Sequence, residues 1–170
     1  GDQQTDMAHT MWTHRRPLHT LIMSVNELFA LDKRVSEFRD LQNLDVQSNQ
    51  LTSLPSSFSQ LQHLTSLNLA RNALSRVPSC ILALTSLVSL DLSDNMLDTL
   101  WSQADAEKAG IAASDVLRSL ATLNLAYNCL STSALVPMPA SLKRLQLSHN
   151  LLREPPVSYT HLTLPTKRIV

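Results

Sequence analysis

Leucines recur along this chain at fixed distances from a regularly placed asparagine. The pattern Leu-x-x-Leu-x-Leu-x-x-Asn-x-Leu is complete over residues 87–97, and the copy over residues 18–28 carries Met23 in one apolar position. Successive asparagines of the pattern are separated by 23, 23, 23, 33 and 22 positions. They are Asn26, Asn49, Asn72, Asn95, Asn128 and Asn150. Six copies in register indicate an internal repeat, and this repeat determines the fold.

Each copy predicts a short strand followed by a turn. The Leu-x-Leu step has the period of two that places both leucines on one face of a strand and polar residues on the other. A single copy cannot bury its leucine face, so neighbouring copies must stack and share one core. The recurring asparagine suits a buried turn, in which its amide satisfies backbone groups of adjacent coils. We therefore expect a stacked ladder of asparagines with a structural role.

The second halves of the regular copies contain a proline at a fixed place. Pro55 follows Leu54 and Pro78 follows Val77, each at the same distance from its asparagine. Proline removes a hydrogen-bond donor and fixes φ, so it favours extended or 3₁₀ structure over a full helix. These segments therefore predict short irregular connections that lead the chain back to the next strand.

Together, the leucine and asparagine motif and the proline segments resemble the leucine-rich-repeat family over residues 18–156. The repeat length of 23 and the proline are similar to the typical class found in intracellular signalling proteins. The resemblance implies an α/β fold, in which a curved solenoid of six repeats carries a parallel β-sheet on its concave face. The convex side is then 3₁₀, irregular or helical. The resemblance also implies a protein-protein interaction module, such as a scaffold or adaptor.

Two copies depart from the regular pattern. The fourth is ten residues too long, and its insertion near residues 101–113 predicts a short helix on the convex side. Ser102 is placed to cap this helix, Asp105 to complete a capping box, and Gly110 to end it. The insertion is either a tolerated loop or a docking element, and surface insertions are more often the former. The fifth copy has Ser133 in place of leucine and two later prolines, which indicate an irregular return.

The two ends of the chain do not match the repeat. Residues 1–17 form an N-terminal flank, in which Trp12 has the phase of a convex apolar position, as in a degenerate repeat or an incomplete cap. Residues 157–170 resemble a translated sequencing-library adapter, so we expect a non-native tail on a fragment of a longer protein. A genuine terminal strand is the alternative for these residues.

Charge and composition exclude several functions. Fourteen Lys and Arg balance fourteen Asp and Glu, which argues against binding to nucleic acid or to a membrane surface. Two glycines leave no glycine-rich phosphate loop, and no apolar run has the ~18 residues that a membrane span needs. The histidines and cysteines show no metal-ligand spacing. We therefore expect no catalytic residues, cofactor, metal or small-molecule substrate, and predict that the chain is not an enzyme.

The cysteines and the absence of glycosylation sequences favour a cytoplasmic location. Cys80 and Cys129 lie 49 positions apart, and no Asn-x-Ser/Thr sequence occurs in the chain.

Two other interpretations of the function stay open. The chain is then either the recruitment or sensor arm of a larger signalling enzyme (a kinase, GTPase, phosphatase complex or ubiquitin ligase) or a fragment of an extracellular receptor.

The candidate site is the concave sheet face, whose outward side chains must meet solvent or a partner. The central column comprises Ile22, Asp45, Asn68, Asp91, Asn124 and Gln146. The second column comprises Ser24, Gln47, Ala70, Ser93, Ala126 and Ser148, and the third column comprises Val25, Ser48, Arg71, Asp94, Tyr127 and His149. Such a small and polar surface suits an extended peptide or a protein ridge.

Ten residues of these columns are the predicted partner-binding set: Asp45, Gln47, Asn68, Arg71, Asp91, Asp94, Asn124, Tyr127, Gln146 and His149. Three of them are aspartates in the middle of the face, with Arg71 between them, whereas the last repeat is basic through Lys143 and Arg144. The hypothesis is that a partner presents basic groups to the middle of the face and that Tyr127 is an aromatic anchor. The alternative is a solvated face whose charges maintain solubility.

Overall fold

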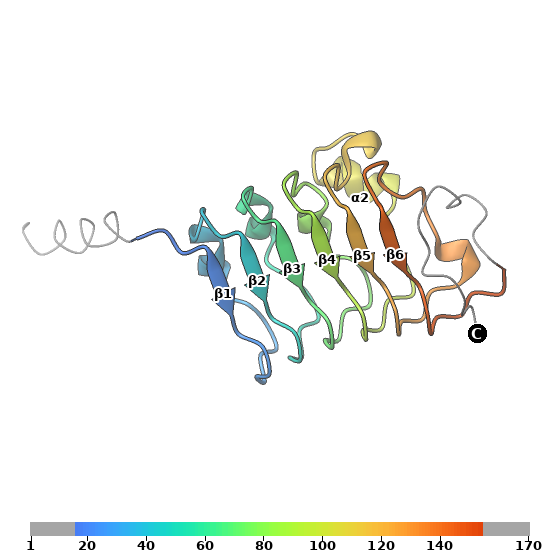
Figure 1. The fold of residues 1–170 in the computed structure, drawn as a ribbon, viewed down its shortest axis with the longest axis horizontal. Coiled ribbons are helices and arrows are strands. Elements are labelled where there is room, and N and C mark those ends of the chain that lie inside the picture. The colour runs from blue at the N-terminus through green and yellow to red at the C-terminus, as the bar shows by residue number, and fades with distance from the viewer. Residues whose placement is uncertain (1–15, 155–170) are drawn as a thin grey trace, which may run out of the picture.

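The computed structural model describes residues 16–154. Within this part of the chain, six short strands form one parallel sheet in sequence order (Figure 1). The strands are β1 (Thr20–Ile22), β2 (Asn43–Asp45), β3 (Ser66–Asn68), β4 (Ser89–Asp91), β5 (Thr122–Asn124) and β6 (Arg144–Gln146). The predicted solenoid, with one strand in each repeat, is confirmed. The interpretations of residues 1–15 and 155–170, including the predicted non-native tail, lie outside the described residues.

The middle leucine of each strand fixes the register of the sheet. Leu44 pairs with Leu67, and Leu90 pairs with Leu123, although the second pair is separated by the longer repeat. The middle leucines from β2 to β6 are at most 2% exposed, because they all point into one core between the sheet and the opposite side of the solenoid. A slip of one residue would move every leucine to the solvent face, so the burial pattern strongly specifies this register.

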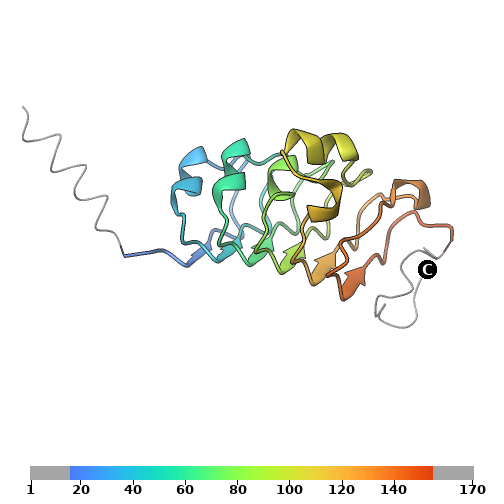
Figure 2. The ribbon, with the colours of Figure 1, turned by 90° about the horizontal axis from the view of Figure 1, so that it is seen from above.

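The opposite side of the solenoid carries short 3₁₀ segments, and the two that follow a proline confirm the prediction (Figure 2). They are η1 (Lys33–Glu37), η2 (Ser56–Gln60), η3 (Ser79–Ile81), η4 (Ala113–Asp115) and η5 (Thr132–Ala134). Pro55 and Pro78 precede η2 and η3 directly. Phe58 and Ile81 then point inward and are fully buried, so these segments close the core that the strands open.

The asparagines form the expected ladder. The Nδ2 of Asn95 donates hydrogen bonds to the carbonyl oxygens of Leu69 (3.0 Å) and Leu92 (3.1 Å), and its Oδ1 accepts one from the Leu74 N–H (3.0 Å). Each amide thus joins its own coil to the coil before it. Asn49, Asn72 and Asn128 make the equivalent bonds. The ladder satisfies backbone groups that a buried turn would otherwise leave unpaired.

The residue before each ladder asparagine adopts a left-handed backbone. In the described residues these positions have φ between 53° and 57°: Val25, Ser48, Arg71, Asp94, Tyr127 and His149. Left-handed φ is uncommon for residues other than glycine, and it is least favourable for a β-branched residue such as Val25. The turn therefore imposes its geometry on six different side chains.

The insertion of the fourth repeat forms the predicted convex helix. α2 (Gln103–Lys108) begins after Ser102, whose hydroxyl accepts a hydrogen bond from the Asp105 N–H, and the Asp105 carboxylate accepts one from the Ser102 N–H in return. Gly110 follows the helix with φ of 73°. α2 lies on the side of the solenoid away from the strands (Figure 2). The capping box and the stop glycine are both confirmed.

The fifth repeat returns irregularly, also as predicted. After η5, residues 135–143 contain no helix or strand, and the half-buried Leu135, Val136 and Met138 pack against the core. Leu151 then bridges to Ser131 of the preceding coil, so the sixth repeat stays aligned beyond its strand.

Candidate functional site

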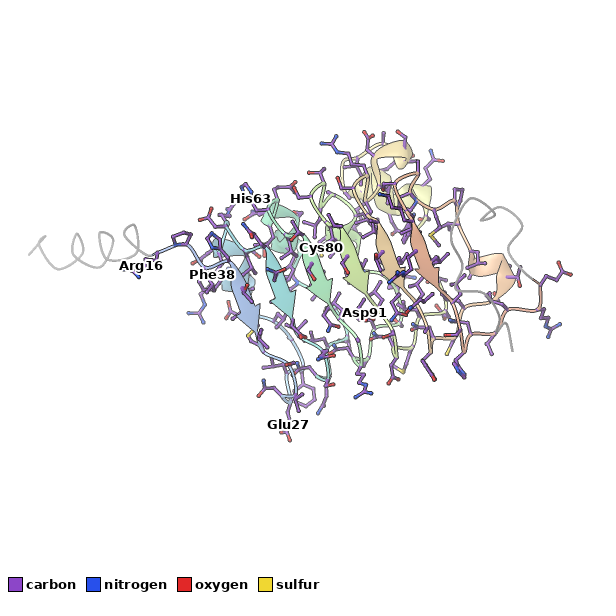
Figure 3. The ribbon with its side chains drawn as sticks, viewed as in Figure 1. Arg16, Glu27, Phe38, His63, Cys80 and Asp91 are labelled. Carbon is purple, nitrogen blue, oxygen red and sulfur yellow. The ribbon has the colours of Figure 1, made fainter. Side chains whose placement is uncertain are left out.

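The outward face of the sheet contains the central column as predicted. The strand register places Asp45 beside Asn68 and Asp91 beside Asn124, so these side chains follow one another across neighbouring strands. Figure 3 shows the side chains from the same direction as Figure 1 and labels Asp91. Ile22, at the start of this column, is 66% exposed.

Hydrogen bonds to the backbone fix four side chains of the central column in one orientation. The Oδ1 atom of each accepts a hydrogen bond from the N–H two residues ahead, at 2.9–3.1 Å. The four are Asp45, Asn68, Asp91 and Asn124. The second oxygen of Asp91 also accepts from the Asn124 Nδ2 (3.3 Å). The column therefore presents carboxylate and amide groups alternately, and these side chains are ordered before any partner arrives.

A further outward column precedes the central one, and sequence reasoning missed it. This strand-start column comprises Thr20, Asn43, Ser66, Ser89, Thr122 and Arg144. Strand alternation would have found it, because the residues on both sides of an inward leucine point outward. Its one charged member, Arg144, is exposed on β6 and places a cation on the sheet itself.

The second column is less open than expected. Ala70 and Ala126 are each 6% exposed, so they contribute little area to a contact. Gln47, the member of this column in the predicted set, is half-buried.

The third column lies in the turns and not on the strands. Each strand ends three residues before it, and the left-handed backbone described above redirects the chain there. The expectation that this column continues the strand face is therefore wrong in geometry, because alternation stops where the extended backbone stops. Arg71, Asp94, Tyr127 and His149 are nevertheless exposed, along the rim where the sheet meets its turns.

The middle of the face has an excess of negative charge. Arg71 Nε lies 3.7 Å from Asp94 Oδ2, and both side chains are mostly exposed, so this ion pair contributes little stability. Within residues 16–154, Asp45 and Asp91 form no ion pair. At the other end of the face, Arg144 and Lys143 are exposed.

An aromatic pair lies on the same rim. The Tyr127 and His149 rings are stacked with centroids 4.2 Å apart and planes 9° from parallel. Tyr127 is 56% exposed despite this contact. The sequence placed both residues in one column, but their stacking depends on side-chain rotamers, which the repeat pattern does not specify.

Known proteins resemble this chain in sequence and in fold. A family model described as leucine rich repeat matches residues 39–97. A leucine-rich-repeat protein of Leptospira interrogans has a similar structure, with 33% sequence identity and a TM-score of 0.69 over 85% of this chain and 35% of that one. The chain belongs to the leucine-rich-repeat family. No curated protein sequence matches it.

Two other solved structures are similar to this leucine-rich-repeat chain. The APL1 leucine-rich repeat domain has 30% identity and a TM-score of 0.65, covering 86% of this chain and 36% of that one. A chain in the Toll–Spatzle complex of Drosophila has 25% identity and a TM-score of 0.73, covering 89% of this chain and 21% of that one. The chain spans less than two fifths of each of these three proteins.

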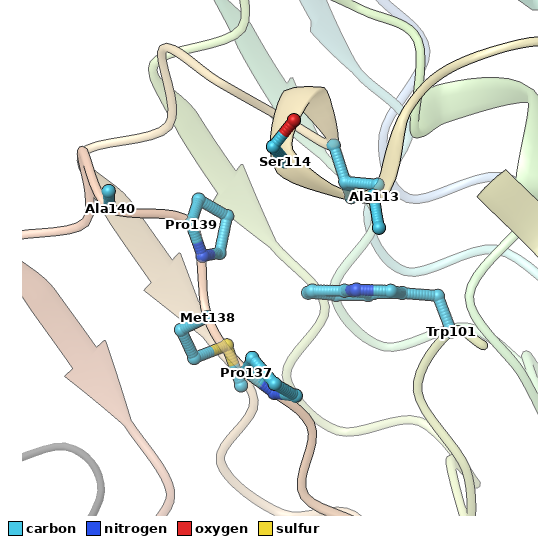
Figure 4. Close-up of a pocket in the computed structure, with 8 residues that line it drawn as sticks. Trp101, Ala113, Ser114, Pro137, Met138, Pro139 and Ala140 are labelled. Carbon is cyan, nitrogen blue, oxygen red and sulfur yellow. The ribbon is translucent and has the colours of Figure 1, made fainter. Parts of the chain in front are cut away.

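The convex side of this leucine-rich-repeat solenoid holds a pocket of about 390 Å³, which the sequence did not predict (Figure 4). It lies where the two irregular repeats meet. Trp101 and the η4 segment, with Ala113 and Ser114, form one side, and residues 137–140 form the other. No charged residue lines it, so the pocket offers no acid, base or cation for chemistry.

The remaining reactive groups are separated from one another. Burial raises the pKa of the Cys80 thiol to about 11, so this thiol is protonated at neutral pH and is a poor nucleophile. Cys129 is exposed, and neither cysteine forms a disulfide. Over residues 16–154, the structure brings together no group of three or more His, Cys, Asp or Glu side chains that could hold a metal ion. The helices in this range are also too short and too polar to cross a membrane.

Proposed function

We propose that this leucine-rich-repeat chain is a scaffold or adaptor module and that its concave sheet face binds an extended segment of a partner protein. The central column carries this proposal. Its polar side chains are held by backbone hydrogen bonds on four consecutive strands, so binding loses little side-chain entropy. Leucine-rich-repeat domains are in general interaction modules, and one of the similar structures is that of the Toll–Spatzle complex.

The charge of the face supports a partner segment with basic side chains. Asp45 and Asp91 project from the sheet without a cation of their own among the described residues, and Asp94 has only a long, exposed contact with Arg71. A basic segment would gain attraction at this place, and the exposed Arg144 at β6 would repel it from the far end. The charge pattern thus favours one position of the segment along the face.

We also infer that the module acts inside the cell. The structure leaves Cys80 and Cys129 unpaired, and the sequence lacks glycosylation sites, as suits a reducing compartment. Fusion to a fluorescent protein and microscopy of the intact gene product test this inference, and secretion would contradict it.

The binding proposal is tested by selecting a phage-displayed library of random peptides on the immobilised chain. Selected peptides are then measured against the double variant Asp91→Lys/Asp94→Lys. The expected result is basic peptides whose affinity falls about tenfold on this charge reversal. The matched control is Glu107→Lys/Asp115→Lys, which makes the same charge change at exposed positions on the convex side.

Thermal unfolding of both double variants tests whether they remain folded. Peptides that bind both double variants as tightly as the unchanged chain, or a selection that enriches no peptide, would contradict the proposed function.

A further inference from the structure

The Tyr127 ring has one covered face and one open face. His149 stacks against one side, with the ring centroids 4.2 Å apart. Tyr127 is still 56% exposed, so the contact with His149 leaves much of its surface accessible. The structure places no other ring or cation against Tyr127 within the described residues. An accessible aromatic face on a fixed backbone is a favourable place for a partner side chain.

The open face of Tyr127 is turned toward Asp94. Tyr127 and His149 occupy equivalent positions in consecutive coils, because the Tyr127 N–H donates to the Ser148 carbonyl (2.9 Å). Their nearly parallel rings are therefore stacked along the solenoid axis. On the other side of Tyr127, the Asp94 N–H donates to the Ala126 carbonyl (2.9 Å), so Asp94 occupies the same position one coil earlier.

Asp94 supplies a carboxylate beside the open ring face. A tyrosine side chain is longer than an aspartate side chain, so a flat group that lies on the ring can also meet the Asp94 carboxylate with its edge. Arg71 contacts Asp94 from the opposite side, where its Nε is 3.7 Å from Oδ2. That pair is exposed and long, so a second guanidinium can share the carboxylate or displace Arg71 at little cost in free energy.

We propose that an arginine side chain of the partner stacks its guanidinium on the open face of Tyr127 and donates hydrogen bonds to the Asp94 carboxylate. This rests on the proposed function and names the side chain that the face selects. A guanidinium is planar, so it can stack on the ring and present its N–H groups edgewise to a carboxylate at the same time. The ammonium group of lysine is not planar and makes only one of these contacts well.

The test uses N-acetyl-arginine amide as a direct probe, followed by NMR of the isotope-labelled chain. The arginine probe is expected to shift the signals of Tyr127 and Asp94 saturably, whereas N-acetyl-citrulline amide, which is neutral and of similar shape, does not. N-acetyl-lysine amide is expected to bind at least about twofold more weakly than the arginine probe. Equal binding of the lysine and arginine probes would overturn the stacking geometry.

Variants separate the ring from the charge. Tyr127→Phe keeps the ring and is expected to keep the affinity for arginine, whereas Tyr127→Leu lowers it about twofold to fivefold. Asp94→Asn is expected to lower the affinity by a similar factor. Arg71→Gln frees the carboxylate and is expected to raise the affinity, an effect that a merely structural role of Arg71 would not give.

The two proposals fail differently. An arginine probe that shifts neither Tyr127 nor Asp94, or that is indifferent to Tyr127→Leu, overturns the arginine site even if face-dependent peptides are selected from the library. Conversely, selective arginine binding in a chain that enriches no peptide supports this site and contradicts the wider peptide-binding face.

Discussion

The regular coils over residues 41–97 and the irregular coils over residues 98–141 share one half of their structure and differ in the other. Their strands pair in the same register, and the Leu97 N–H reaches Asn128 across 31 residues with the same 3.0 Å bond that joins Leu74 to Asn95 across 21. Their convex halves differ: each regular coil has a 3₁₀ turn, whereas the irregular coils have α2 with η4 and then η5 with an irregular return. The strand and the asparagine therefore fix each coil, whereas the length of the return is free to vary.

The strand half is expected to be equally intolerant of charge in both regions. Leu90 and Leu123 are at most 1% exposed, so Leu90→Asp and Leu123→Asp each bury a charge without a partner. Each should lower the free energy of unfolding by about 4 kcal/mol or more, as measured by urea unfolding followed by circular dichroism. Val88→Asp, at a position 43% exposed, is the control and should change it little. A mutant of either leucine with unchanged unfolding would contradict the register.

The ladder should have the same strength inside the regular coils and across the insertion. Asn95→Ala and Asn128→Ala each leave buried backbone groups unpaired, so both should lower the free energy of unfolding by about 2–4 kcal/mol. Asn26→Ala is the matched control, since Asn26 is exposed and bonds only within its own coil. A much smaller loss at Asn128 than at Asn95 in urea unfolding would show that the insertion weakens the ladder.

A substitution in the convex half should affect only the structure next to it. Ser102→Ala removes the cap of α2 and should lower stability by about 1 kcal/mol, with faster amide exchange in α2 but not in β4 or β5. Faster exchange throughout the sheet would contradict a local role.

The same cap has a defined pH dependence. The hydrogen bonds from Ser102 hold the pKa of the Asp105 carboxyl below its usual value of 3.8. The folded-state pKa is depressed, so this contribution is fully present above about pH 4 and is lost as the pH falls through the folded-state pKa. Carboxyl NMR should therefore show the Asp105 pKa rising in Ser102→Ala, and an unchanged titration would contradict the assigned bonds.

A substitution at a left-handed turn position should give the smallest change in the free energy of unfolding, and this change should be an increase. Val25 is 77% exposed and has φ of 56°, which a β-branched residue adopts with strain. Val25→Asn should raise the free energy of unfolding by about 0.5–1 kcal/mol, because asparagine tolerates this backbone. Val88→Asn, outside the left-handed positions, should give no gain. Thermal unfolding of both variants measures the difference.

The sequence was sufficient for every feature that depends on spacing. The strands, the ladder, the 3₁₀ returns after Pro55 and Pro78, and the capped helix between Ser102 and Gly110 follow from residue types at fixed positions. The left-handed turns were missed because no glycine marks them in any copy. Because six different residues occur at this position, the sequence there does not indicate the backbone conformation.

The candidate site was predictable only in part. The repeat placed the central column correctly, since register alone brings Asp45 beside Asn68. The stacking of Tyr127 on His149 depends on side-chain rotamers. The pocket beside Trp101 depends on how two irregular segments pack against each other. The repeat pattern specifies neither property, because it describes only the features that all coils have in common.

The bridging of Leu97 to Asn128 has a consequence for how such a chain can change over generations. Because the ladder joins coils through groups near the strands, a segment added on the back enters without shifting any residue of the front. Changes in the length of the return and changes in the residues of the sheet face can thus arise independently. The chain can acquire or lose material beside Gly110, whether by natural insertion or by a laboratory tag, and leave the order of Asp91, Asn124 and Gln146 as it was.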